Sequence, residues 1–161
     1  MPITGDVYRE IGRSAAGAVS VVATFDAERR HVAALTVSSF VTLSFDPPLV
    51  MFAIQHGGAS FRPMVEAREF GVSLLTAAQR HLAERFATRG SERRDVGDFE
   101  QGQTLPVPLL AGSLAQMECR THQLVMSGDH AIVVGLVENA RTQPGEPLLY
   151  FARRYGSFKP L

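Results

Sequence analysis

Four consecutive small residues, Thr36-Val37-Ser38-Ser39, form a segment that could contact a flat, polar ligand. Three of them carry hydroxyl groups, which both donate and accept hydrogen bonds. Their small side chains would also let a ligand approach the backbone closely. The segment lies between two predicted strands, so a polar bend in a sheet explains the same residues. Taken alone, the segment fits that simpler explanation better.

A second candidate is the loop Gln55-His56-Gly57-Gly58-Ala59-Ser60, which follows an apolar strand and precedes a predicted helix. Backbone N–H groups at the start of a helix favour an anion such as phosphate. The loop lacks the Gly-Lys-Ser/Thr ending of a P-loop, and an ordinary strand-to-helix turn is the alternative. Arg85 and Arg89 lie near a predicted helix end, where they could reach a phosphate or extend into solvent.

His130 follows Gly128 and Asp129 in a predicted turn. An imidazole there could contact a ligand or transfer a proton near neutral pH, and an exposed histidine without a role is the alternative. The five histidines show no HExxH spacing and Cys119 is the single cysteine, so no metal site is expected. The sequence also lacks the GxSxG motif of serine hydrolases and the GxGxxG turn of a doubly wound α/β fold.

Short β-rich segments separated by turn residues must position these groups. Alternating or continuous apolar residues predict strands over 19–25, 31–35, 40–45, 49–54, 70–75, 114–126, 131–137 and 148–151, with a last strand near Tyr155. The first strand should place Val19, Val21, Ala23 and Phe25 on one face. The 49–54 run suits a strand buried on both faces.

Three helices are predicted around these strands. One covers 6–15 with Asp6 as its N-cap, one begins near Ser60, and one follows a capping box at 76–79 and carries Leu82 and Phe86 on one face. Residues 89–103 are polar and predict a long segment without regular structure. Many short strands with few peripheral helices indicate a mainly β protein built as a closed or partly closed antiparallel barrel.

The overall composition limits the classes of partner. A chain of 161 residues and 17.5 kDa fits a single domain spanning 1–161. Sixteen basic residues balance sixteen acidic ones, so no global field favours nucleic acid or an anionic membrane. The start of the chain has no secretory signal pattern and no apolar run is long enough to cross a bilayer, so a cytoplasmic location is expected.

Several short segments occur in order along almost the whole chain, from Tyr8 to Tyr155. They are Gly17–Val22, Leu35–Phe40, Leu43–Val50, Leu82–Ala87, Gly128–His130 and Pro147–Tyr150. Their order and spacing resemble the short-chain flavin reductase family, the reductase components of two-component flavin-dependent monooxygenases. The resemblance implies an FMN-binding split barrel with Greek-key-like topology. It also implies a homodimer that holds flavin near its interface.

The same resemblance implies a role for each candidate residue. By position, Thr36, Val37, Ser38 and Ser39 would line the isoalloxazine ring and ribityl chain, and Ala53, Ile54 and Gln55 would form the pocket wall. Ser60 would contact the phosphate, with Arg85 and Phe86 close by. His130, the candidate catalytic residue, and Tyr155 would border the nicotinamide site. Relatives often carry Arg, Lys or Asn before the phosphate-contacting residue, whereas the 56–60 loop here leaves more of that contact to backbone N–H groups.

The activity implied is that of an NAD(P)H:flavin oxidoreductase. It would use FMN or FAD as the flavin and NADH or NADPH as co-substrate, and it would supply reduced flavin to a partner oxygenase. Two alternatives from other classes are a non-catalytic or sensory flavin-binding split barrel and a barrel that binds no ligand.

Overall fold

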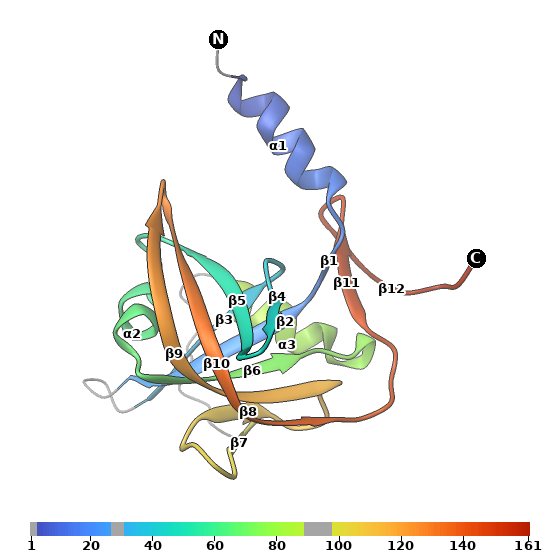
Figure 1. The fold of residues 1–161 in the computed structure, drawn as a ribbon. Helices are drawn as coiled ribbons and strands as arrows, with labels where there is room; N and C mark the ends of the chain where they lie inside the picture. The colour runs from blue at the N-terminus through green and yellow to red at the C-terminus, as the bar shows by residue number, and fades with distance from the viewer. Residues whose placement is uncertain (1–2, 27–30, 89–97) are drawn as a thin grey trace.

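Antiparallel strands make up most of the chain in the computed structural model, which describes residues 3–26, 31–88 and 98–161 (Figure 1). The helices are α1 (Gly5–Ser14), α2 (Phe61–Glu66) and α3 (Arg80–Ala87), and α3 follows the short 3₁₀ helix η1 (Ala77–Gln79). The strands are β1 (Gly17–Ala18), β2 (Ser20–Asp26), β3 (His31–Val37), β4 (Val41–Phe45), β5 (Pro48–Gln55), β6 (Glu69–Leu74), β7 (Phe99–Gln101), β8 (Pro108–Leu110), β9 (Ala115–Ser127), β10 (His130–Thr142), β11 (Leu148–Phe151) and β12 (Arg154–Ser157). Within the described ranges, no helix is both long enough and apolar enough to span a membrane.

Seven strands form one coiled sheet in the order β3-β2-β6-β9-β10-β5-β4, with every neighbouring pair antiparallel. The two edge strands, β3 and β4, are consecutive in the chain and are joined by the bend at 38–40. The sheet coils until β3 also contacts β5. The predicted mainly β, barrel-like antiparallel fold is therefore confirmed. A smaller sheet, β1-β11-β12, carries α1, which stands away from the barrel (Figure 1).

The described residues form two large apolar clusters and a small one of Leu105, Val107 and Leu109. One large cluster lies inside the coiled sheet, where the rings of Phe52 and Phe70 meet edge to face at a centroid distance of 5.5 Å. The other large cluster lies between the sheet and α3, which buries Leu82 and Phe86 as predicted. Strand β8 packs so closely on β6 that a Cβ atom on Gly71 would lie 2.2 Å from the Pro108 carbonyl oxygen. Close backbone packing at this point therefore requires glycine.

Several local predictions differ from the structure. Thr4, not Asp6, caps α1, because its hydroxyl accepts the Val7 N–H. Phe25 is half exposed although the other three residues predicted for its face of the first strand are buried, and β5 alternates in burial instead of being buried on both faces. The segment predicted to lack regular structure contains β7, which pairs with β8; its residues 89–97 lie outside the described ranges.

Strand β9 alternates polar and apolar residues, which predicts buried apolar and exposed polar side chains. In the structure, the polar residues Gln116 and Glu118 are buried as well as their apolar neighbours. The Glu118 carboxylate accepts backbone N–H groups of Gln103, Thr104 and Leu105 at 2.6 to 2.8 Å. It also accepts the Asn139 amide at 2.9 Å. The strongest single influence, burial, acts to raise the pKa of Glu118, but the hydrogen bonds together outweigh it and hold the pKa below its ordinary value of 4.5. Glu118 thus fixes the 103–105 loop over β9.

Replacing Glu118 with glutamine should lower the free energy of unfolding by about 2 kcal/mol near neutral pH, because a charged acceptor is lost from three backbone N–H groups. Since the folded-state pKa is depressed, the wild-type advantage is present above pH 4.5 and is lost as the pH falls through the folded-state pKa. Urea denaturation of wild type and E118Q between pH 3 and 7 measures this difference.

The exposed carboxylate of Glu138, 3.2 Å from Arg120 Nε, provides the control E138Q, which should change stability by less than about 1 kcal/mol. Equal stability of wild type and E118Q at every pH would contradict the role assigned to Glu118.

Candidate functional site

The bend between β3 and β4 is held by two hydroxyl groups. Thr36 Oγ1 donates to the Ala83 carbonyl oxygen of α3 at 2.7 Å. Ser39 Oγ accepts the Ala53 N–H of β5 at 3.0 Å and donates to the Ala53 carbonyl oxygen at 3.3 Å. These hydroxyls join the bend to α3 on one side and to β5 on the other. Ser38, between them, is exposed.

A cavity of about 150 Å³ opens at this bend. Three of the predicted flavin-contacting residues line it together with Tyr155, so the structure brings part of the predicted site together. Val19, Ala87 and Tyr150 also line it, and the sequence analysis did not identify them. The full lining is Val19, Thr36, Val37, Ser38, Ala87, Tyr150 and Tyr155.

Tyr150 of β11 lies near the bend because β1, the neighbouring strand of β11, packs against the bend. Gly17 of β1 pairs with Tyr150 of β11, and a Cβ atom on Gly17 would lie 2.6 Å from the Ser38 carbonyl oxygen. Only glycine lets β1, and therefore β11, lie this close to Ser38. Gly17 was identified from the sequence only as the first residue of the Gly17–Val22 segment. Its contact with Ser38 depends on tertiary packing, which the local sequence does not record.

Two tyrosines form the aromatic wall of the cavity, and an arginine lies over the ring of one of them. The rings of Tyr150 and Tyr155 lie 5.2 Å apart between centroids, and the Arg80 guanidinium lies 5.7 Å from the Tyr155 ring centre. Arg80 Nε also donates to Glu84 at 2.8 Å. Burial, followed by the nearby Tyr150 and Glu84, raises the pKa of Tyr155. Its phenol is therefore neutral at physiological pH and offers a flat apolar face with a hydrogen-bonding tip.

The predicted pocket wall, which includes Ala53 bonded to Ser39, lies at the C-terminal end of β5. The catalytic candidate lies beside that end of the strand. Gln55 pairs with His130, the first residue of β10, and the Asp129 carbonyl oxygen accepts the His56 N–H at 2.9 Å. His130 Nδ1 lies 2.7 Å from Asp129 Oδ1, and this hydrogen bond is the main reason that the pKa of the exposed Asp129 is lowered. His130 is not among the residues that line the cavity at the bend.

Three of the side chains predicted near the phosphate or on the pocket wall point into the protein, which corrects the prediction at these positions. Ser60 Oγ donates to the Ala34 carbonyl oxygen at 2.9 Å and is buried. Phe86 packs on Phe99 in the core, and Ile54 is buried inside the barrel. These three side chains present no surface to a ligand, because tertiary packing uses their apolar or polar groups internally. Arg85 forms an ion pair with Asp98 and is only partly buried.

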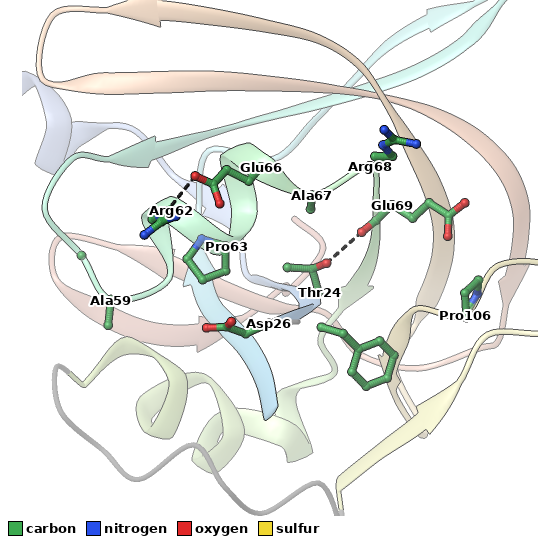
Figure 2. Close-up of a pocket in the computed structure, with 12 residues that line it drawn as sticks. Thr24, Asp26, Ala59, Arg62, Pro63, Glu66, Ala67, Arg68, Glu69 and Pro106 are labelled. Carbon is green, nitrogen blue, oxygen red and sulfur yellow. Dashed lines mark hydrogen bonds and ion pairs between the residues drawn. The ribbon is translucent and has the colours of Figure 1, made fainter. Parts of the chain in front are cut away.

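A larger cavity lies elsewhere, beside α2 and the end of β2 (Figure 2). It measures about 720 Å³ and is lined by residues of both charges, including Asp26, Arg62, Glu66 and Glu69. Arg62 pairs with Glu66 at 2.9 Å, and Thr24 donates to the Glu69 carbonyl oxygen at 2.9 Å. Gly58 and Ala59 of the candidate anion-binding loop line it, but none of the residues assigned a role by the family resemblance does. Mixed charges give no field of one sign that would select a ligand, so the cavity at the bend is the better candidate.

The fold is shared with solved flavin reductases. The chain superposes with a TM-score of 0.89 on the flavin reductase component of a bacterial two-component tryptophan halogenase, at 29% identity, covering 98% of this chain and 100% of the other. It superposes with a TM-score of 0.87 on an NADH:FAD oxidoreductase of Streptomyces globisporus solved with NAD and FAD fragments, at 28% identity and 99% and 98% coverage. The fold is therefore the split barrel of flavin reductases.

Residues 12–159 match the sequence model of the flavin reductase like domain, and this chain belongs to that family. It is 38% identical over 149 residues to the NADH:riboflavin 5'-phosphate oxidoreductase of Streptomyces pristinaespiralis, covering 91% of this chain and 84% of that protein. It is 39% identical over 153 residues to the reductase component of a Thermus thermophilus 4-hydroxyphenylacetate 3-monooxygenase, covering 93% and 94%. The predicted family is thus confirmed.

Replacing Thr36 with valine should lower the free energy of unfolding by about 1 to 2 kcal/mol, because the Ala83 carbonyl oxygen loses its donor. It should also weaken FMN binding, since α3 carries Ala87 of the cavity wall. Thermal unfolding and FMN fluorescence titration measure the two effects. T36S, which keeps the hydroxyl, is the control. A T36V variant with unchanged FMN affinity would show that the hydroxyl does not shape the site.

Proposed function

We propose that this protein is an NADH:flavin oxidoreductase that reduces FMN or FAD and supplies the reduced flavin to a partner oxygenase. The observation that carries the proposal is the cavity at the bend, where Thr36, Val37 and Ser38 face Tyr150 and Tyr155. Family membership and the names of the relatives support it, since they include NADH-dependent FMN and FAD reductases. All of residues 1–161 would serve as one flavin reductase domain in the cytoplasm.

The lining of the cavity fits one edge and one face of a flavin ring. Small side chains at the bend expose backbone groups and the Ser38 hydroxyl to the polar edge, while the tyrosine rings offer flat apolar surface. Ligand pockets usually measure roughly 300 to 1,000 Å³. At about 150 Å³, the cavity in one chain would hold only part of a flavin. The remaining wall must come from elsewhere.

Bound flavin supplies the redox chemistry by accepting hydride from the nicotinamide. The protein contributes position: it holds the two rings in contact and keeps water away from the transfer. No side-chain nucleophile is required. Under this proposal His130 and Tyr155 border the nicotinamide, Ala53 and Gln55 continue the wall along β5, and Arg85 with the Ser60 backbone lies nearest the phosphate.

The direct test follows NADH oxidation by absorbance after addition of free FMN or FAD under anaerobic conditions. We expect catalytic turnover with at least one flavin. In the H130A variant, the KM for NADH should rise about five- to tenfold while the flavin Kd stays within about twofold, since one polar contact contributes about 1 kcal/mol.

The matched control is H122A, because His122 is an exposed histidine on β9 to which the proposal assigns no ligand contact. An H130A enzyme with wild-type KM and kcat for NADH would remove His130 from the proposed site. Wild-type protein that binds flavin tightly and does not oxidise NADH would favour a non-catalytic flavin-binding protein.

We further infer that two copies of the chain form a homodimer through the β4 edge. This strand is apolar yet exposed: the side chains of Val41 and Leu43 are about half exposed, and Phe45 is fully exposed. An exposed apolar edge strand is a site for association. The edge begins directly after the bend, so a partner there would supply the missing wall of the cavity.

Replacing Phe45 with aspartate should convert the dimer to a monomer and lower turnover, because the charge would be buried without a partner at the interface. Size-exclusion chromatography with light scattering should give twice 17.5 kDa for wild type and 17.5 kDa for F45D. F25D is the matched control, since Phe25 is a half-exposed phenylalanine on β2. A wild-type monomer with full activity would overturn the proposed dimer.

A further inference from the structure

A second cavity of about 230 Å³ lies between the end of α1 and the turn that joins β11 to β12; we call it the arginine notch. The Ala152 N–H of the turn donates to the Arg13 carbonyl oxygen at 3.2 Å, which fixes the helix end to the turn. Three of its lining residues are arginines. The full lining is Arg9, Gly12, Arg13, Ala15, Tyr150, Ala152 and Arg153.

The turn holds Arg153 in a disfavoured backbone conformation. Ala152 and Arg153 have φ angles of 49° and 62°, in the left-handed region that favours glycine and asparagine. They join the paired residues Phe151 and Arg154. Non-glycine residues in this region are strained, and such strain is concentrated at ligand-binding positions. The disfavoured conformation of Arg153 therefore indicates that its charged side chain has a function at the tip of the turn.

The arginines of the notch are not fully neutralised by carboxylates, so they could bind an anion. Arg9 and Arg13 pair with Asp6 and Glu10 at 2.5 and 3.0 Å, but these carboxylates are largely exposed, so the pairs are weak. Within the described ranges, Arg153 makes no ion pair, and the buried Nε of Arg13 has no hydrogen-bond partner. Guanidinium groups bind phosphate oxygens through charge-assisted hydrogen bonds. A phosphate in the notch would satisfy both residues.

The notch adjoins the cavity at the bend, because Tyr150 lines both. A ligand with its ring at the bend could thus extend past Tyr150 into the notch. We propose that the arginine notch binds the diphosphate of NADH, whose nicotinamide borders Tyr155 at the cavity. This proposal depends on the proposed function. FAD also carries a diphosphate, but the proposed function places the flavin phosphate near Arg85 and Ser60, so FAD binding serves as the comparison.

The test compares R153G with wild type in NADH oxidation, using FMN as the flavin, and in FAD binding by fluorescence. Glycine suits the positive φ of residue 153, so the variant should fold at least as well as wild type. If the notch binds NADH, the KM for NADH should rise about tenfold with kcat nearly unchanged. A tenfold rise in the Kd for FAD with unchanged NADH kinetics would overturn the assignment of the notch to NADH.

Two further variants separate local charge from general effects. R154G removes a neighbouring charge that does not line the notch and should leave both measurements unchanged. R153K keeps the charge and should recover most of the lost affinity. A folded R153G with unchanged KM for NADH and unchanged Kd for FAD would overturn the proposal.

Calorimetric titration with ADP, which carries the diphosphate alone, tests the notch independently of turnover. Wild type should bind ADP at least tenfold more tightly than R153G. If wild type does not oxidise NADH, the proposed function fails, and ADP titration still decides the notch: equal ADP binding by both proteins would overturn it.

Discussion

The closure of the coiled sheet at the bend between β3 and β4 determines where every part of the candidate site lies. The two edge strands are consecutive in the chain, so the sheet can close only if the bend is fixed on both sides. The Thr36 hydroxyl fixes it to α3, and the Ser39 hydroxyl fixes it to β5. These two hydroxyls bond within the protein, while Ser38 between them is exposed and lines the cavity.

The opposite side of the sheet depends on a buried charge. Glu118 sits beneath the 103–105 loop and is compensated by three backbone N–H groups and one amide. A buried carboxylate is tolerated only with such complete hydrogen bonding. This arrangement covers the outer face of β9 near β7 and β8, so that apolar residues can fill the inner face. The 103–105 loop is thereby fixed to β9, a central strand of the sheet that contains the bend.

Tyr150 links the candidate site to the N-terminal helix. It belongs to the cavity at the bend, and it also borders the arginine notch formed by α1 and the β11–β12 turn. The strain of that turn, at Ala152 and Arg153, opposes stability in a region with few buried side chains. Local instability of this kind is retained where function needs a particular side chain in place.

The sequence by itself determined the mainly β fold, the positions of most strands along the chain, the family and the hydroxyl segment of the bend, because these depend on local periodicity and on short segments of adjacent residues. Only the tertiary structure decided which side chains face a ligand. Ser60, Ile54 and Phe86 turned inward, while Tyr150 and Gly17 became part of the site through the β1–β11 pairing. The burial of Gln116 and Glu118 and the N-cap at Thr4 were likewise not predicted. Side-chain direction and burial depend on contacts between segments far apart in sequence, and no local pattern records them.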